Sequence, residues 1–346
     1  MIDVGLIGFG LAGRAFHAPV IRAVPGLRLA AILQRSGNEA AEQYPDVPIV
    51  RSLEELLATR EIRLVVIATP NLTHFPLAQQ CLAAGRDVLV DKPFTTTLEE
   101  AAELVQLAQK AGRILTVYQN RRYDGDFAAI RQLVASGALG RIVSFETNYD
   151  RFRPKLKPGA WRERAEPGSG IFFDIAPHLI DHALVLFGLP EFITADIRIE
   201  RDGAVADDTF DLVLRHANGI RATLRSSILA AAARPRFVLN GTAGSFIKQS
   251  FDPQEANLRR GNIPTDTAWG AEPEEKWGVL TVAEGETMIE KRIPSAACDY
   301  RDFYANLRDA ILGRGTLAVT PQWALDVMRL LGLARESSRR RCTVSW

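Results

Sequence analysis

Predominantly apolar runs alternate with segments of helical spacing along the first 120 residues. The run at residues 64–68, which no polar position interrupts, is typical of a strand that is buried on both faces of a parallel sheet. We expect strands at residues 2–7, 27–33, 64–68, 87–90 and 114–117, and helices at residues 12–23, 53–58, 74–84 and 98–111. A Thr97-x-x-Glu100 capping box and Gly112 mark the two ends of the last helix. This alternation predicts a doubly wound α/β domain over residues 1–120.

Past Asp124 the pattern changes to one amphipathic helix and then successive strands. Strands are expected at residues 141–149, 192–200, 209–215, 220–227 and 236–240. Helices are expected at residues 127–134, 299–312 and 321–338, and the segment that begins at residue 172 runs into a further helix that ends near residue 188. Asn218-Gly219 predicts a hairpin between two of these strands. Successive strands imply a mostly antiparallel sheet, so residues 121–346 are expected to form an α+β domain. The loop at 150–170 is long enough to be functional, and residues 252–278 look irregular.

Length and composition favour two domains as well. A chain of 346 residues exceeds the usual size of one hydrophobic core. A net charge of +1 gives no electrostatic reason to expect nucleic acid or an anionic membrane as a partner. No uninterrupted apolar stretch reaches the roughly 18–20 residues of a membrane span, and no cleavable leader is recognisable, so we expect a cytoplasmic protein. Cys81, Cys298 and Cys342 are widely separated, which predicts reduced thiols and no metal site.

The first apolar run leads directly into Gly8-Phe9-Gly10-Leu11-Ala12-Gly13. In a strand-turn-helix unit the first glycine of this motif allows the turn, the second lets a pyrophosphate approach, and the third lets helix and strand pack closely. The following helix N-terminus offers free N–H groups to the phosphates. Glycine is common here, at 26 of 346 residues, so a structural turn is the alternative. The strand before the motif favours a dinucleotide-binding Rossmann domain.

The second strand ends in Gln34-Arg35-Ser36, where a Rossmann domain selects its cofactor. An acidic residue at this place would bind the ribose 2′-hydroxyl of NAD. These three residues include no carboxylate that would repel a 2′-phosphate, while Arg35 can pair with the phosphate and Ser36 can donate to it. The alternative is that Arg35 is simply solvated. We therefore expect NADP to be preferred, with NAD possible.

Polar residues follow two further strands at their carboxyl ends, which form the ligand side of an open α/β sheet. Thr69-Pro70-Asn71 follows one strand, and Asp91-Lys92-Pro93 follows the next. A lysine is usually a solvated charge, but Lys92 is placed for chemistry because a proline fixes the chain directly after it. His74, as a lone histidine in a helical pattern, is more often a capping or packing residue than a chemical one.

Asp174 and His178 lie four residues apart in a pattern that runs into a helix. At that spacing the two side chains share one helix face. The alternative is that Asp174 only caps the helix and His178 is a satisfied core histidine. A histidine has an ordinary pKa close to working pH, so His178 is suited to act as a general base toward an alcohol.

Four motifs together resemble the glucose-fructose oxidoreductase, inositol dehydrogenase and rhizopine catabolism family, written Gfo/Idh/MocA. They are Gly8 to Gly13, Asp91-Lys92-Pro93, the segment 118–126 and Asp174-x-x-x-His178. The resemblance covers essentially the whole chain. Residues 148–154, 244–248 and 269–270 further resemble the branch of NADP-dependent scyllo-inositol dehydrogenases.

The resemblance implies a nicotinamide-dependent dehydrogenase that acts on a secondary alcohol of a cyclitol or sugar. It implies an open C-terminal sheet used for homo-oligomer contacts, dimer or tetramer, and a cis Lys92-Pro93 bond. Catalytic roles pass to Lys92, which would stabilise the alkoxide, to Asp174, which would orient the substrate, and to His178. Further cofactor contacts are assigned to Thr69, Pro70, Asn71, His74, Asp91, Lys92, Gln119, Trp161 and Arg162, and substrate contacts to Asn120, Tyr149 and Arg153.

Three departures from the family pattern remove no catalytic group. Asp91 replaces the usual Glu, Gln119 stands where this branch tends to carry His, and Ala176 stands where Gly is usual. A non-catalytic dinucleotide-sensing regulator is one alternative, but it would be expected to lose the lysine or the histidine. Oxidation or reduction of an aldose, a dihydrodiol or another carbonyl on the same scaffold is the other alternative.

Overall fold

The computed structural model describes residues 1–157, 159–265, 269–296 and 298–346, and it divides into two compact units. The first unit contains residues 1–120, 254–269 and 299–326, and the second contains the remainder. The two later segments of the first unit fall in the stretch that we expected to belong entirely to the C-terminal domain. Residue 158 of the 150–170 loop and residues 266–268 of the 252–278 stretch lie outside the described residues.

The first unit is built on a six-stranded parallel sheet in the order β3-β2-β1-β4-β5-β6. Its strands are β1 Ile2–Ile7, β2 Leu27–Leu33, β3 Ile49–Val50, β4 Ile62–Ile67, β5 Asp87–Val90 and β6 Leu115–Val117. β1 pairs in parallel with both β2 and β4, so the strand order reverses beside β1. The doubly wound prediction is confirmed, and the carboxyl ends at this reversal are where such sheets bind ligands.

The helices of the first unit are α1 Ala18–Ala23, α2 Glu39–Gln43, α3 Leu53–Ala58, α4 His74–Ala83, α5 Leu98–Ala111, α8 Gln254–Arg259 and α9 Tyr300–Ile311. Of these, α3, α4, α5 and α9 begin and end close to the predicted residues, whereas α2 and α8 were not predicted. The capping box of α5 is present, with Gly112 in the left-handed region at φ 60°. α8 corrects the expectation of an irregular stretch after residue 252.

One helix departs from its predicted form. The segment expected as a single α-helix over residues 12–23 is a π-helix, η1 Ala12–His17, followed by α1. Pro19 offers no main-chain N–H, so the preceding turn cannot complete an ordinary hydrogen-bond ladder there. The side chain of His17, the last residue of η1, is completely buried.

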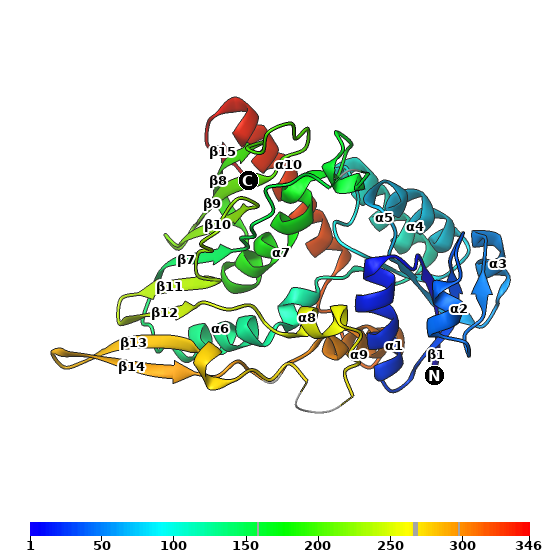
Figure 1. Ribbon diagram of the computed structural model, residues 1–346, viewed down its shortest axis with the longest axis horizontal. Helices are drawn as coiled ribbons and strands as arrows, with labels where there is room; N and C mark the ends of the chain where they lie inside the picture. Colours follow the sequence, from blue (N-terminus) through cyan, green and yellow to red (C-terminus); the bar gives the residue numbers. More distant parts are fainter. Residues whose placement is uncertain (158, 266–268, 297) are drawn as a thin grey trace. The chain divides into compact units, whose positions relative to one another are not determined.

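The second unit contains a nine-stranded sheet in the order β14-β13-β12-β11-β7-β10-β9-β8-β15 (Figure 1). Its strands are β7 Ile142–Asn148, β8 Pro190–Arg198, β9 Thr209–His216, β10 Arg221–Ser227, β11 Phe237–Gly241, β12 Gly244–Lys248, β13 Gly278–Glu284, β14 Thr287–Ile293 and β15 Val344–Ser345. The pair β7–β10 is parallel, and the other pairs are antiparallel. The prediction of a large, mostly antiparallel sheet is confirmed.

Helix α7 Gly170–Phe187 packs on one face of this sheet against β7, β8, β9 and β10. Phe210, Leu212 and Leu214 on β9 are completely buried beneath it, as their alternation predicts. α6 Gly125–Ser136 packs beside α7, and α10 Pro321–Arg340 continues from the first unit into the second. Among the residues described, α7 has the length and apolar composition of a membrane span, but 72% of it is buried within the protein, as expected for a core helix.

Candidate functional site

The glycine turn of the first unit has the steric properties that its motif predicts. Gly8 adopts φ 96°, and a Cβ added there would lie 2.6 Å from the Ala68 carbonyl oxygen. A Cβ at Gly13 would overlap the carbonyl oxygen of Gly8, so only glycine allows this approach of helix to strand. A Cβ at Gly10 would meet no described atom within 4 Å, which leaves its main chain accessible. The turn therefore fits a dinucleotide pyrophosphate.

The loop after β2 carries the three residues expected to select the cofactor. Arg35 and Ser36 are exposed, while the Gln34 side chain is engaged within the loop. Gln34 Oε1 accepts a hydrogen bond from Ala40 N at 2.9 Å. Arg51, which the sequence analysis missed, donates to the carbonyl oxygens of Gln34 and Gly37 at 2.8 Å each. Arg51 follows the two-residue strand β3, which is too short to show a hydrophobic pattern.

His74 connects the ends of two strands. Its ring is fully buried, with Nε2 2.9 Å from the carbonyl oxygen of Thr69 and Nδ1 2.8 Å from that of Pro93. Burial lowers the pKa of His74, although Asp91 and the two carbonyl groups oppose this effect. The contacts fit the packing role that we considered for a lone histidine. A direct contact of His74 with cofactor stays a prediction.

The turn after β5 contains the lysine expected to be catalytic, and the Lys92-Pro93 bond is cis, as predicted. Asp91 Oδ1 accepts a hydrogen bond from Lys92 N at 2.8 Å. Burial raises the pKa of Asp91, but His17, Lys92 and His74 outweigh burial and hold this pKa below its ordinary value. Asp91 is therefore an anion that orders the main chain at Lys92.

His17 lies near this turn and, like Arg51, was not predicted from the sequence to belong to the site. Its Nε2 lies 3.8 Å from Asp91 Oδ2, and its Nδ1 lies 2.6 Å from the Tyr304 hydroxyl oxygen. The ring also packs on Tyr118, with centroids 4.4 Å apart. Its position four residues after Gly13 was the available signal. After β6, Gln119 and Asn120 are buried at the same carboxyl edge of the sheet.

In the second unit α7 carries both remaining catalytic candidates. Ser169 is the N-cap of α7, so Asp174 is the fifth helical residue and does not cap the helix. His178 follows one turn later and is 4% exposed. Arg162 Nε lies 3.3 Å from Asp174 Oδ1, and the Arg162 guanidinium stacks on Trp161 at 4.4 Å. The structure thus brings Trp161, Arg162 and Asp174 together. The contact of Trp161 and Arg162 with the cofactor and the contact of Asp174 with the substrate stay predictions.

A buried ion pair fixes α7 beyond His178. Arg122 donates two hydrogen bonds to Asp181, both at 2.7 Å, and the two side chains are 8% and 2% exposed. Removing one partner of such a pair typically costs about 3–5 kcal/mol, because it leaves an uncompensated buried charge. At the other end of α7, Asp207 accepts from Phe172 N at 2.6 Å. These contacts hold the helix that presents Asp174 and His178, and neither was foreseen from the sequence.

Tyr149 and Arg153 were expected to contact substrate. Tyr149 is 5% exposed, and its hydroxyl accepts from Arg121 at 2.8 Å and from Arg151 at 3.0 Å. Arg153 is exposed, and its main-chain N donates to the Ile228 carbonyl oxygen at 2.7 Å. Their contact with substrate stays a prediction.

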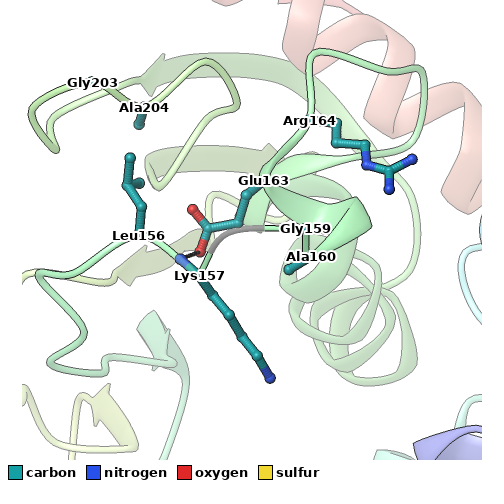
Figure 2. Close-up of a pocket in the computed structure, with 8 residues that line it drawn as sticks. All are labelled: Leu156, Lys157, Gly159, Ala160, Glu163, Arg164, Gly203 and Ala204. Atoms are coloured by element: carbon teal, nitrogen blue, oxygen red, sulfur yellow. Dashed lines mark hydrogen bonds between the residues drawn. The ribbon is translucent and has the colours of Figure 1, made fainter.

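A small pocket lies in the same unit, beside the segment that carries Trp161 and Arg162. Figure 2 shows Glu163 turned toward the Lys157 main-chain N, which donates to Glu163 Oε1 at 3.3 Å. The pocket is lined by Leu156, Lys157, Gly159, Ala160, Glu163, Arg164, Gly203 and Ala204. None of these residues belongs to the predicted site, so the pocket is not the candidate site.

The catalytic candidates belong to both units. Lys92 is part of the first unit, and Asp174 and His178 are part of the second. Within the second unit the structure places the two residues of α7 one turn apart. That Asp174 and His178 act on one substrate together with Lys92 stays a prediction.

Both parts of the chain match known protein families. Residues 2–119 match the oxidoreductase family with an NAD-binding Rossmann fold, and residues 127–247 match the GFO/IDH/MocA C-terminal domain. The chain is 43% identical over 343 residues to the uncharacterized oxidoreductase YdgJ of Escherichia coli, covering 99% of this chain and 98% of that protein. This chain belongs to the Gfo/Idh/MocA family of oxidoreductases.

One further relative and one solved structure are similar along the whole length of this Gfo/Idh/MocA protein. IolW of Bacillus subtilis, named scyllo-inositol 2-dehydrogenase (NADP(+)), is 34% identical over 99% of this chain and 95% of its own length. The solved structure of the oxidoreductase YvaA from Bacillus subtilis is 34% identical with a TM-score of 0.96, covering 100% of this chain and 98% of that one. The family resemblance expected from the four motifs is confirmed.

Proposed function

We propose that this oxidoreductase transfers hydride between NADP and a secondary alcohol or ketone of a cyclitol or sugar, such as scyllo-inositol. One observation carries the proposal: Asp174 and His178 project from one face of α7, as the chemistry of the family motif requires. The name of IolW supports the substrate class and the nucleotide. The test is a panel of initial rates with cyclitols and aldoses against both cofactors. Turnover of aldoses alone would contradict the cyclitol assignment.

The chemistry follows from the residue types. His178 takes the proton of the alcohol, since a histidine titrates close to working pH. Lys92 stabilises the developing alkoxide with its positive charge. Asp174 accepts a hydrogen bond from a substrate hydroxyl and thereby orients the sugar ring. When bound, the nicotinamide supplies the hydride acceptor. In the reverse direction His178 returns the proton.

NADP is expected to be used with a higher kcat/KM than NAD. The Arg35 guanidinium can pair with the 2′-phosphate, and its replacement in Arg35→Asp removes this partner and adds a repulsive charge. We expect Arg35→Asp to shift the kcat/KM ratio toward NAD by about tenfold or more. The ratio is measured with one substrate and both nucleotides. If kcat/KM with NADP does not exceed kcat/KM with NAD in the unmodified enzyme, the preference is contradicted. If Arg35→Asp leaves the ratio of the two kcat/KM values unchanged, the role of Arg35 is contradicted.

We also propose that the protein is a homo-oligomer, formed through the sheet face opposite α7. Val213 points away from the buried Leu212 and Leu214 and pairs across this face with Thr223 and Thr194. The same face carries charged residues beside this row, with Arg225 paired to Asp211 at 3.2 Å and to Glu146 at 2.9 Å, so we expect a polar interface, and the family resemblance supplies the precedent for an oligomer. Light scattering at micromolar concentration is expected to give a mass above that of one 38.1 kDa chain. A monomer at that concentration would refute the proposal.

A further inference from the structure

A carboxylate lies in the loop after β2, although Gln34-Arg35-Ser36 contains none. Glu39, the first residue of α2, is exposed, and its Oε2 accepts a hydrogen bond from the Gln34 side-chain amide. A Cβ at Gly37 would overlap this same oxygen. Gly37 therefore leaves the space through which the Glu39 carboxylate folds back to the end of β2.

Arg51 keeps the loop in this conformation. Its Nη1 donates to the carbonyl oxygens of Gln34 and Gly37, and its Nη2 lies 3.2 Å from Asn38 Oδ1. The three acceptors belong to residues on both sides of Arg35 and Ser36. One guanidinium thus fixes the main chain of the whole turn, and Glu39 stays beside the residues expected to contact the adenosine ribose.

The Glu39 carboxylate is held in its ionised form. Its own main-chain N–H and then the Gln34 amide keep the pKa of Glu39 below its ordinary value, with a smaller contribution from Arg14. An anion at this end of β2 has two consequences for a dinucleotide. It can accept a hydrogen bond from a ribose 2′-hydroxyl, and it repels a 2′-phosphate.

We infer that Glu39 limits the preference for NADP over NAD. It supplies, five positions after Gln34, the carboxylate that the end of β2 itself lacks. Arg35 attracts the 2′-phosphate and Glu39 opposes it, so the two residues act in opposite directions on the same ratio. This inference rests on the proposed nucleotide site and adds a residue that limits the NADP preference. A role of Glu39 confined to capping α2 would change binding of both nucleotides equally.

The test compares Glu39→Gln with the matched control Glu42→Gln in the full chain. Glu42 lies in the same first turn of α2 and is also exposed. The dissociation constants of NADPH and NADH are measured by fluorescence titration, without any sugar substrate. Glu39→Gln is expected to tighten NADPH and weaken NADH, so that the ratio Kd(NADH)/Kd(NADPH) rises about fivefold or more. Glu42→Gln is expected to leave that ratio within about twofold.

The outcomes separate this inference from the function on which it rests. If both nucleotides bind the unmodified chain and Glu39→Gln leaves the ratio unchanged, the inference is overturned and the proposed function stands. Parallel changes in both dissociation constants would also overturn it, since they indicate only a structural role at α2. If neither nucleotide binds the unmodified chain, the proposed function fails and the inference fails with it.

Discussion

His178→Ala is expected to lower kcat by about 10² or more and to leave the Kd of NADPH within about twofold. The alcohol proton must leave as hydride departs, and histidine is the side-chain type in the proposed site whose unperturbed pKa lies close to working pH. His178 lies in the second unit, whereas the glycine turn that fits the nucleotide lies in the first. The measurement is kcat at saturating substrate, together with the NADPH titration.

His216→Ala is the matched control for loss of a buried histidine. His216 lies on β9 of the same unit, is 3% exposed, and packs edge-on against Phe187. Its removal is expected to reduce stability but to leave kcat within about threefold of the unmodified enzyme, because it plays no part in proton transfer. A His178→Ala enzyme that keeps kcat within about threefold would contradict the assignment. The base would then be sought among Lys92, Tyr149 and Asp174.

Lys92→Met is expected to lower kcat by about 10² or more, because the developing alkoxide loses its positive charge. Methionine keeps most of the length and the apolar stem of lysine, so the turn after β5 is expected to retain its packing. Lys92→Arg, which keeps the charge at a different geometry, is expected to recover part of the rate. The readout is kcat with the NADPH Kd, which a loss confined to catalysis leaves nearly unchanged.

Lys110→Met is the control for loss of a lysine in the same unit. Lys110 is exposed near the end of α5 and belongs to no predicted site. It should leave kcat unchanged within error, as surface substitutions usually do. Equal kcat in the Lys92→Met and unmodified enzymes would show that the alkoxide is stabilised elsewhere.

Elements with strong local signals were predictable from the sequence. The parallel strands other than the two-residue β3 are mostly apolar, α5 has both of its end signals, and the turn at Gly8 follows a strand that leads directly into glycine. Strand β14 was missed because most of its residues are exposed and three of its seven residues are charged, so its pattern resembles a loop. Helix α8 was missed because six residues are too few to establish a period.

The candidate site was predictable where a motif carries the residue type, as for Lys92, Asp174 and His178. Residues that act through tertiary contacts were not. Arg122 and Asp181 are 59 positions apart, and only the fold shows that they form one buried pair. Glu39 reaches Gln34 because Gly37 leaves room, and no spacing rule contains that information. Sequence patterns locate helices, strands and motifs, whereas the partners of a charged side chain can be identified only in the folded structure.

The division of the first unit into three stretches of chain limits how the protein can be cut or recombined. Thr116 donates to the Val319 carbonyl oxygen at 2.7 Å, and Tyr118 packs edge-on against Phe303 at 4.9 Å. A fragment that ends at residue 120 would lose these partners and expose Tyr118 to water. Residues 1–120 are therefore not expected to fold as an independent nucleotide-binding domain that could be moved to another protein. A chimera with another substrate domain would have to carry the 254–269 and 299–326 stretches along with it.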